Sequence, residues 1–243
     1  VSPAREGWVD EPERADFVVH PRGDGPWDGT TEYRVLVLGE RASVPLESLG
    51  DIVLAVVDEE SELTYLRTDT PDVTGSSDSA IDGPIEADLL EDRVLCWEPP
   101  AALYERGFYG QRMDRDDDTI QLSLLEAAYL TAEGVLRVTG GLEAIEASGR
   151  AVEGERFDRR LVVYRALRDR GLVPKTGFKF GADFRTYADV EHVEDLGHSE
   201  LLVRVLDADA VLSPRDLALD VRLAHGVRKR MVFALVSEGS VRW

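Results

Sequence analysis

The chain has 243 residues, of which 28 are basic and 48 acidic, so its formal net charge is −20. This length suits two or three small domains, each with its own core. No apolar run approaches the roughly 18 residues that a membrane-spanning helix needs, and the single cysteine, Cys96, excludes an internal disulfide, so we expect a cytoplasmic protein.

The negative charge is unevenly distributed along the chain. Residues 1–156 carry a net charge of −22, whereas residues 157–243 hold 15 basic and 13 acidic side chains. The three lysines of the chain, Lys175, Lys179 and Lys229, all lie in the second of these sections. An acidic surface with almost no lysine is typical of adaptation to high salt, in which attraction to phosphate is screened within a few ångströms. An ordinary acidic cytoplasmic protein is the alternative.

The first section of the chain is rich in strand signals. Between residues 14 and 66, apolar alternation and short apolar runs occur in FVVH, EYRVLVLG, DIVLAVVD and ELTYL, interrupted by PRGDGPWDG and VPLESLG. This pattern predicts a strand-rich domain with one short helical segment. Residues 67–88 are rich in Ser, Thr, Asp, Gly and Pro without any period, which indicates a flexible linker or an exposed loop.

The next section predicts a small α/β unit. RVLCWEPP (93–100) is typical of a short strand, and two segments, 119–134 and 155–171, have apolar residues at helical spacing and end in a glycine. The residues expected on the two helical faces are Leu122, Leu125, Ala128, Tyr129 and Ala132 in the first segment, and Phe157, Leu161, Tyr164 and Leu167 in the second.

The last section alternates strand and helix. SPRDLALDVRLAHG (213–226) predicts a helix. Its start signal consists of Ser213, Pro214 and Asp216. Its buried stripe is expected to consist of Leu217, Val221 and Ala224. Arg222 lies off that stripe and is expected to face solvent or a ligand. VRKRMVFALV (227–236) follows as a strand apolar enough to be central or to lie at an interface. We therefore expect an α/β (α+β) chain of small mixed-sheet domains.

The sequence also repeats itself. The aligned segments are ADFVVH (15–20) with ADFRTY (182–187), TEYRVLV (31–37) with SELLVRV (199–205), and DIVLAVVDEESELTY (51–65) with RMVFALVSEGSVRW (230–243). The identical ADF openings and the same order of elements favour a duplication. The copies differ where chemistry is possible, because Tyr187, His198 and Lys229 of the second copy stand opposite His20, Thr30 and Gly50 of the first. The first copy is expected to keep the scaffold and to lack the site.

Tyr187, His198 and Lys229 each stand where a strand or helix is expected to begin or end, an arrangement that can bring distant side chains to one cleft. As a set they suit a metal-free acid–base site: a nearby cation makes tyrosine a base, histidine donates a proton near neutral pH, and lysine stabilises developing negative charge. Cleavage of RNA by its own 2′-hydroxyl requires such groups. The structural alternatives are a strand-end tyrosine, a strand-capping histidine and a solvated lysine. His192 and His225 are expected to be surface residues.

Several motifs follow one another in the second half of the chain. They are RGFYGQ (106–111), QLSLLEAAYL (121–130), KTGFKFGADFRTY (175–187), GHSELLVRV (197–205) and RLAHGVRKRMVFALV (222–236). In this order they resemble the archaeal tRNA-splicing endonuclease, or tRNA-intron lyase, family. The resemblance covers residues 89–243, and it is specific because separate motifs occur in the family's order.

The resemblance implies a domain organisation. Residues 1–70 look like the degenerate catalytic-type domain of the family's double-length, homodimeric branch, and residues 71–88 would be a linker. Residues 89–155 resemble the N-terminal-type domain, and residues 156–243 resemble the catalytic domain. That branch has a further N-terminal-type domain ahead of its degenerate copy. Its absence here, with Val1 in place of a starting methionine, predicts a chain shortened at its start.

The resemblance also implies a role for each candidate residue. Tyr187 would be the general base that removes the 2′-hydroxyl proton, His198 the general acid that protonates the leaving 5′-oxygen, and Lys229 the group that stabilises the transition state. The products would be a 2′,3′-cyclic phosphate and a 5′-hydroxyl, and no metal or other cofactor is expected. Arg222 and Arg242 would be RNA-binding residues whose guanidinium groups stack on splayed-out bases.

The family's substrate implies an assembly. A precursor tRNA with a bulge-helix-bulge shape has two scissile bonds, and a homodimer with one active site per chain would present two sites across a twofold axis. The acidic segment DEESE (58–62) is either a solvated turn or the loop with which the family docks on the catalytic domain of the other subunit. We therefore expect a homodimeric, halophilic and archaeal RNA endonuclease.

Two other functions are alternatives. A non-catalytic structural or RNA-binding subunit of the same assembly is disfavoured by the intact Tyr187, His198 and Lys229. A metal-dependent nuclease with a related core needs clustered acids and a nearby lysine, and the last section contains no Asp…Glu-x-Lys run. Sensitivity to a chelator separates this second alternative from the metal-free site.

Overall fold

The computed structural model describes residues 1–5, 11–77, 80–114 and 117–243, and the chain divides into two compact units. The first unit comprises Val1–Asp72 and Ala208–Gly226, and the second comprises Val73–Asp207 and Val227–Trp243. Both contain small mixed sheets and helices, which confirms the expected α/β (α+β) class. Among the helices of the described ranges, none has the length and apolar character required to span a membrane.

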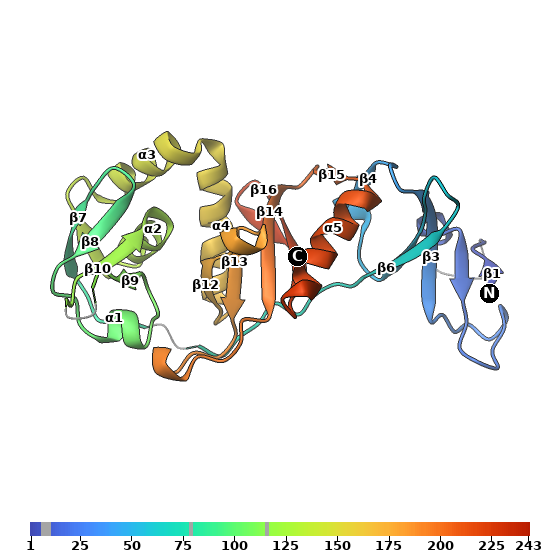
Figure 1. Cartoon of the computed structure of the whole chain (residues 1–243), viewed down its shortest axis with the longest axis horizontal. Helices are drawn as coiled ribbons and strands as arrows, with labels where there is room; N and C mark the ends of the chain where they lie inside the picture. The colour runs from blue at the N-terminus through green and yellow to red at the C-terminus, as the bar shows by residue number, and fades with distance from the viewer. Residues whose placement is uncertain (6–10, 78–79, 115–116) are drawn as a thin grey trace. The chain divides into compact units, whose positions relative to one another are not determined.

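The first unit is built on a five-stranded sheet with the order β1-β2-β3-β5-β6. Figure 1 labels β1, β3 and β6 of this sheet. β3 and β5 run parallel, and the other neighbours run antiparallel. β4 pairs with β15, the strand that leads into α5. The bounds are β1 (Ser2–Pro3), η1 (Pro12–Arg14), β2 (Phe17–Val19), β3 (Tyr33–Gly39), β4 (Val44–Pro45), η2 (Leu46–Ser48), β5 (Ile52–Val57), β6 (Leu63–Thr68), β15 (Val211–Leu212) and α5 (Pro214–Gly226).

The second unit contains two five-stranded sheets, β11-β7-β8-β10-β9 and β12-β13-β14-β16-β17. The bounds of the first part are β7 (Ile85–Leu89), β8 (Arg93–Cys96), α1 (Ala102–Glu105), β9 (Gln111–Arg112), β10 (Ile120–Ser123), α2 (Leu124–Ala132), β11 (Leu136–Val138) and α3 (Gly141–Glu153). Those of the second part are α4 (Glu155–Asp169), β12 (Val173–Thr176), η3 (Phe178–Phe180), β13 (Phe184–Tyr187), η4 (Val193–Asp195), β14 (Leu201–Asp207), β16 (Arg230–Ser237) and β17 (Ser240–Arg242).

The sheet of the first unit and the last sheet of the second have the same topology. β14 and β16 run parallel while their sheet's other neighbours run antiparallel, as is also true of β3 and β5 in the first unit. β2 and β13 begin at Phe17 and Phe184, the phenylalanines of the two ADF motifs. This shared topology supports the duplication inferred from the sequence.

Helix α2 begins later than the apolar pattern predicts. Ile120–Ser123 form β10, which pairs antiparallel with β8, so Leu122 enters the core from a strand and its predicted helical position is wrong. The Ser123 side chain accepts a hydrogen bond from the backbone of Glu126, and the Glu126 side chain accepts one from the backbone of Ser123. This capping box sets the start of the helix at Leu124.

Helix α3 is not predicted by the sequence pattern, partly because Gly149 lowers helix propensity by about 1 kcal/mol relative to alanine. The fold requires this glycine. A Cβ at position 149 would lie 2.4 Å from the ring of Phe157, so the missing side chain allows α3 and α4 to pack closely. α4 itself agrees with its prediction, because the four apolar residues expected on its inner face are all buried.

The segment that follows β6 is partly fixed within the second unit, although its composition predicts a flexible linker or an exposed loop. The Gly75 N–H donates to the Arg170 carbonyl at 2.8 Å, and the Ser76 N–H donates to the Ala188 carbonyl at 2.7 Å. A Cβ at Gly75 would lie 2.4 Å from the carbonyl oxygen of Gly171. Glycine therefore allows the two backbones to cross at close range.

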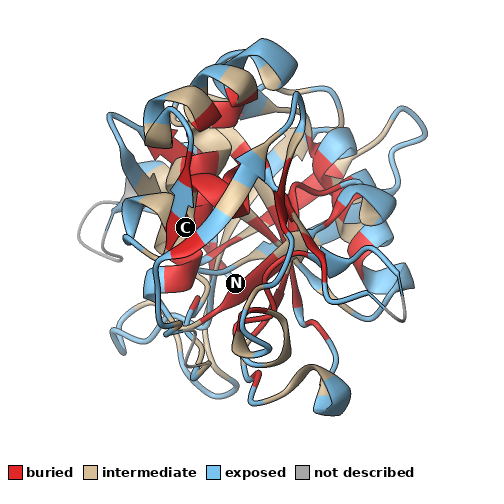
Figure 2. Cartoon of the chain, turned by 90° about the vertical axis from the view of Figure 1, so that its left-hand side faces the viewer, coloured by how far each residue is buried: buried red, intermediate tan, exposed pale blue. Residues whose placement is uncertain are grey.

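One hydrophobic core extends through both sheets of the second unit. Buried residues lie along the strands and the inner helix faces, while loops are mostly exposed (Figure 2). α4 packs against β14, β16 and β17. β16 is central, as expected from its apolar sequence, and Val232 and Ala234 from this strand are buried. This packing holds rigid the sheet that carries the candidate site.

We expect Gly149→Ala to lower the free energy of unfolding by about 1–2 kcal/mol. The gain in helix propensity, about 1 kcal/mol, is smaller than the cost of overpacking against the buried Phe157 ring, about 2–3 kcal/mol at an approach of 2.4 Å. Gly226 is a matched control, since it is also helical and a Cβ there meets nothing within 4 Å. Denaturant unfolding of both variants tests this, and a Gly149→Ala protein as stable as the parent would contradict it.

Candidate active site

Three strand ends meet at one end of the last sheet. β13 runs antiparallel to β14, so the end of β13 lies beside the start of β14, and β16 runs parallel to β14, so their starts are adjacent. The Glu200 N–H donates to the Thr186 carbonyl at 3.3 Å, and the Arg230 N–H donates to the Glu200 carbonyl at 3.0 Å. The sheet therefore brings Tyr187, the loop that precedes β14 and Lys229 to the same end.

Tyr187 is held in a small apolar cluster. The residue is 8% exposed and packs with Phe108, Val173 and Val190. The centroids of the Phe108 and Tyr187 rings are 5.7 Å apart in an edge-to-face arrangement. The guanidinium of Arg185 lies 5.6 Å from the Tyr187 centroid, within the range of a cation–π contact. The tyrosine ring thus contacts both apolar side chains and a cation.

Lys229 connects the third strand end to the loop that carries His198. Its Nζ donates to the backbone oxygen of Ser199 and, at 2.6 Å, to the Ser199 hydroxyl. His198 directly precedes Ser199, and its side chain is exposed. Partial burial and then the positive charge of Arg185 lower the pKa of Lys229. An exposed imidazole and a half-buried ammonium group therefore border the same loop.

The two arginines expected to bind RNA are both exposed. Arg222 lies on α5 of the first unit, and its exposure agrees with its predicted place off the buried stripe. Arg242 lies on β17, where it pairs with Leu235 in the second half of β16, whereas Lys229 precedes the start of that strand. Arg242 is therefore separated from Lys229 along the sheet. The RNA-binding roles of both arginines stay predictions.

A pocket of about 500 Å³ is lined by residues of both sheets of the second unit. Its wall includes Tyr104, Gln111, Arg160, Lys175 and Arg185. Amide and guanidinium donors of this kind are suited to phosphate oxygens and base edges. In the part of the chain that the structure describes, no group of three or more His, Cys, Asp or Glu side chains is arranged to hold a metal ion.

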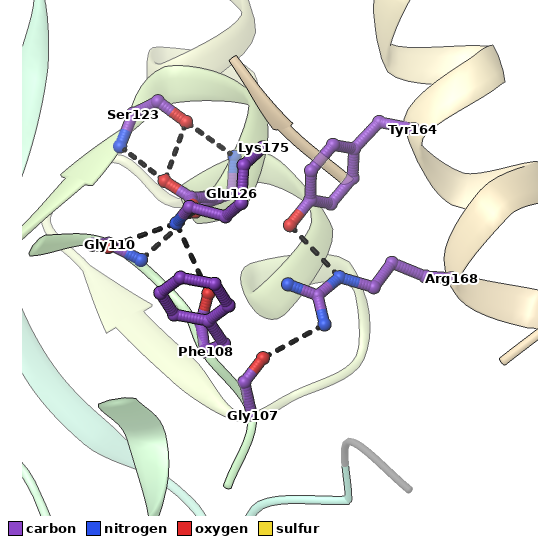
Figure 3. Close-up of polar contacts among 8 residues, drawn as sticks. All are labelled: Gly107, Phe108, Gly110, Ser123, Glu126, Tyr164, Arg168 and Lys175. Atoms are coloured by element: carbon purple, nitrogen blue, oxygen red, sulfur yellow. Dashed lines mark hydrogen bonds and ion pairs between the residues drawn. The ribbon is translucent and has the colours of Figure 1, made fainter. Parts of the chain in front are cut away.

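A buried ion pair that sequence periodicity does not reveal lies next to the site. Lys175 Nζ is 2.7 Å from Glu126 Oε1 and donates to the carbonyls of Phe108 (3.1 Å) and Gly110 (2.9 Å) (Figure 3). The Glu126 carboxylate also accepts from the N–H groups of Gly110 and Ser123, both at 2.9 Å, and from the Ser123 hydroxyl at 2.8 Å. Burial alone would raise the pKa of Glu126, but Lys175 and these donors lower it to about 2.

Arg168 of α4 binds the same turn. Its Nη1 donates to the Gly107 carbonyl at 3.0 Å, and its Nε donates to the Tyr164 hydroxyl at 3.1 Å (Figure 3). Its guanidinium also lies 3.8 Å from the centroid of the Tyr109 ring. The 107–110 turn is therefore held by two different elements, α4 through Arg168 and β12 through Lys175.

The 107–110 turn links the buried network to Tyr187. Phe108, whose carbonyl accepts from Lys175, is the residue whose ring packs against Tyr187. The motifs RGFYGQ and KTGFKFGADFRTY contain these residues, so the sequence indicated the segments and not their pairing. In the sequence, Lys175 stands out only as one of three lysines, and that rarity is the available signal for its importance.

Two family models match the chain from residue 85 to its last residue, with a short gap between them. The tRNA intron endonuclease, catalytic C-terminal domain, matches residues 157–243, and the tRNA intron endonuclease, N-terminal domain, matches residues 85–147. The chain is 73% identical over 244 residues to the tRNA-splicing endonuclease of Natronomonas pharaonis, an alignment that covers 100% of this chain and 73% of the relative. The chain belongs to the tRNA-splicing endonuclease family.

Two further tRNA-splicing endonucleases have a similar extent of alignment. The enzyme of Haloarcula marismortui is 64% identical over 246 residues, with 100% of this chain and 72% of the relative covered. That of Haloferax volcanii is 54% identical over 250 residues, with 100% and 73% covered. The chain is therefore a lyase-type endoribonuclease with a catalytic C-terminal domain. These relatives come from halophilic archaea, in agreement with the adaptation to high salt expected from composition and with the archaeal family expected from the resemblance.

We expect the Glu126–Lys175 pair to stabilise this endonuclease fully above pH about 4.5 and progressively less as the pH falls toward 2. The pKa of Glu126 is lowered from 4.5 to about 2 by folding, so the unfolded chain takes up this proton first. The contribution lost over this window is on the order of 3 kcal/mol. Glu126→Gln should therefore destabilise the protein by about 3–5 kcal/mol at pH 7, because Lys175 stays buried without its partner, and by less near pH 3.

Denaturant unfolding at a series of pH values from 7 to 3 measures this difference. Glu86→Gln is the matched control, because it removes one partner of the exposed Arg137–Glu86 pair and should change stability by less than about 1 kcal/mol. A loss for Glu126→Gln that is the same at pH 7 and pH 3 would contradict the linkage.

Proposed function

We propose that this endonuclease cleaves precursor tRNA at bulge-helix-bulge intron junctions by metal-independent attack of a ribose 2′-hydroxyl. The family implies precursor tRNA as the substrate. The observation that carries the proposed mechanism is the meeting of Tyr187, the His198 loop and Lys229 at one end of the last sheet. The products are a 2′,3′-cyclic phosphate and a 5′-hydroxyl.

Each of the three side chains has one role in this proposal. Tyr187 removes the 2′-hydroxyl proton, with the guanidinium of Arg185 5.6 Å from the centroid of its ring. His198 protonates the leaving 5′-oxygen, for which its exposed position is suitable. Lys229 stabilises the negative charge on the phosphorus centre. A general acid or base of this kind contributes about 10²- to 10⁴-fold in rate.

The proposed domain organisation has a degenerate catalytic-type domain at residues 1–70, a linker at 71–88, an N-terminal-type domain at 89–155 and a catalytic domain at 156–243. The last four residues of that linker lie in β7, which is part of a sheet of the second unit. The common topology of the first and last sheets supports the pairing of the two catalytic-type domains. The first copy serves as a spacer and docking surface. We also propose a cytoplasmic location, in keeping with the single cysteine and the RNA substrate.

The proposed assembly is a homodimer with two active sites for the two scissile bonds. The DEESE loop docks on the catalytic domain of the other subunit, and Arg222 and Arg242 stack on bases of the bulge. Support for docking comes from the loop's geometry: Asp58 Oδ1 accepts the N–H groups of Glu60 and Glu62 at 2.9 Å, which makes a defined turn with exposed carboxylates.

We expect the parent chain to cleave a bulge-helix-bulge RNA in molar salt with EDTA, leaving cyclic-phosphate ends. Lys229→Ala should slow cleavage by at least about 100-fold, because the transition-state charge loses its ammonium partner. Lys179→Ala, at an exposed lysine in the same section, is the control. Mapping of the ends and single-turnover rates measure the effect. Cleavage only after a divalent metal is added would overturn the mechanism, and no cleavage at all would favour a structural subunit.

His198→Ala is expected to lose cleavage and to keep RNA binding, because a general acid acts after the substrate is bound. Binding is measured with an RNA that carries 2′-deoxyribose at the scissile positions, and cleavage with the unmodified RNA. His192→Ala, in the same loop, is the matched control and should retain both. If His198→Ala lost both properties equally, the assigned role would be wrong.

A further inference from the structure

Arg185 is a half-buried cation at the candidate site. Its Nε is buried and has no hydrogen-bond partner, and among the residues that the structure describes no Asp or Glu forms an ion pair with it. Other arginines of this region are paired: Arg156 and Arg160 lie 2.6 Å and 3.2 Å from the Asp183 carboxylate. Because removal of a guanidinium from water without an anion is unfavourable, Arg185 is poised to bind one.

Arg185 lies near both Tyr187, the proposed general base, and Lys229, the proposed stabiliser of the transition state. It stands two residues before Tyr187 on β13, so the two side chains project from the same face, with 5.6 Å between the guanidinium and the ring centroid. It is also close enough to Lys229 to contribute, after burial, to the lowered pKa of that lysine. A phosphate that reaches Tyr187 and Lys229 therefore comes within reach of Arg185.

Arg185 lies near two other cations, of which Lys175 has an ion-pair partner and Lys229, among the residues that the structure describes, has none. Its register partner on β12 is Lys175, whose ammonium is already paired with Glu126. Lys229 donates to Ser199, a neutral residue. Arg185 also lines the pocket of about 500 Å³, so part of its side chain borders open space, whereas Tyr187, His198 and Lys229 do not line this pocket. An anion bound beside Arg185 and Lys229 would relieve the repulsion between them.

We propose that Arg185 binds the phosphate at which the RNA is cleaved, an inference that rests on the proposed function. Its guanidinium donates hydrogen bonds to a non-bridging oxygen of that phosphate. During the reaction the bond from the 2′-oxygen to phosphorus forms, the bond from phosphorus to the 5′-oxygen breaks, Tyr187 takes the 2′-hydroxyl proton and His198 supplies a proton to the 5′-oxygen. Arg185 and Lys229 share the negative charge that develops on the non-bridging oxygens.

High salt gives a reason for an arginine at this position. At an ionic strength of 1 M the Debye length is about 3 Å, so charges act on a phosphate almost entirely through direct contact. A guanidinium offers several N–H donors in a planar fork that matches two oxygens, whereas an ammonium acts as a point charge. Arg185→Lys therefore keeps the positive charge and loses the planar set of N–H donors. Arg185→Met keeps an unbranched side chain against Tyr187 and loses both the charge and the donors.

The test combines these variants with sulfur substitution of the scissile phosphate. The substrates are bulge-helix-bulge RNAs with oxygen, or with sulfur in either stereochemical position, at one cleavage site, and the readout is the single-turnover rate at saturating RNA in EDTA. With oxygen, we expect Arg185→Met to be about 10- to 100-fold slower than the parent, and Arg185→Lys to be intermediate. One sulfur isomer should lower the cleavage rate of the parent. The same isomer should lower the rate of Arg185→Met little further, because this variant already lacks the guanidinium that contacts the substituted oxygen.

Controls separate binding of phosphate from a structural role. Arg137→Met, which removes an exposed arginine paired with Glu86, should retain the parent's rate and its sensitivity to sulfur. Thermal unfolding shows whether Arg185→Met is folded, and Arg185→Lys provides a second, more conservative variant. A structural role for Arg185 would slow all three substrates by the same factor, and that outcome would overturn the inference.

Failure of this inference is distinguishable from failure of the proposed function. If the parent cleaves and Arg185→Met cleaves equally fast, phosphate binding by Arg185 is wrong and the proposed function stands. If the parent does not cleave the oxygen substrate, the proposed function fails. In that case the affinity for the 2′-deoxy RNA still tests phosphate binding: Arg185→Met should bind it about 3- to 10-fold more weakly, and an equal affinity would contradict the inference.

Discussion

The buried ion pair between Glu126 and Lys175 is the constraint on which the second unit depends. Glu126 stands in the first turn of α2, Lys175 lies on β12, and both bind the turn that contains Gly110. Removal of either partner would leave the other charge buried and unpaired, at a cost of about 3–5 kcal/mol. The pair therefore couples the N-terminal-type part to the catalytic part, and through Phe108 it also sets the surroundings of Tyr187.

The charges of this protein act on RNA in two ways, by long-range repulsion and by direct contact. The net charge of −20 would repel RNA in dilute buffer, but the high salt to which haloarchaeal proteins are exposed screens this long-range repulsion. What matters at a binding surface is then the set of groups in direct contact with the ligand. The end of the last sheet provides such groups in Arg185 and Lys229, so a strongly acidic enzyme and a cationic site are physically compatible.

The first sheet and the last sheet share a topology and differ at the strand end where Tyr187 stands. The strand order and directions depend on apolar pairing in the sheet, which both copies retain. At the position aligned with Tyr187, the first copy has His20, whose ring bonds to the Ser2 hydroxyl and the Thr30 carbonyl, both at 2.7 Å. At this strand end of the first sheet, both ring nitrogens of His20 are therefore engaged in hydrogen bonds to neighbouring residues.

The sequence was sufficient for features that depend on neighbours along the chain. The apolar periods of α4 and α5 and the apolar run of β16 predict these elements, and the motifs around Tyr187, His198 and Lys229 indicate which segments carry the candidate chemistry. Capping and periodicity are local, so they can be read from a few consecutive residues.

Tertiary contacts set the remaining features, because they join residues that are far apart in the sequence. The close approach of α3 to α4 depends on the absence of a side chain at Gly149 opposite Phe157, and no local period encodes that match. The pairing of Lys175 with Glu126 crosses 49 positions. That Arg185 forms no ion pair within the described ranges likewise becomes visible only when strands from different parts of the chain form one sheet.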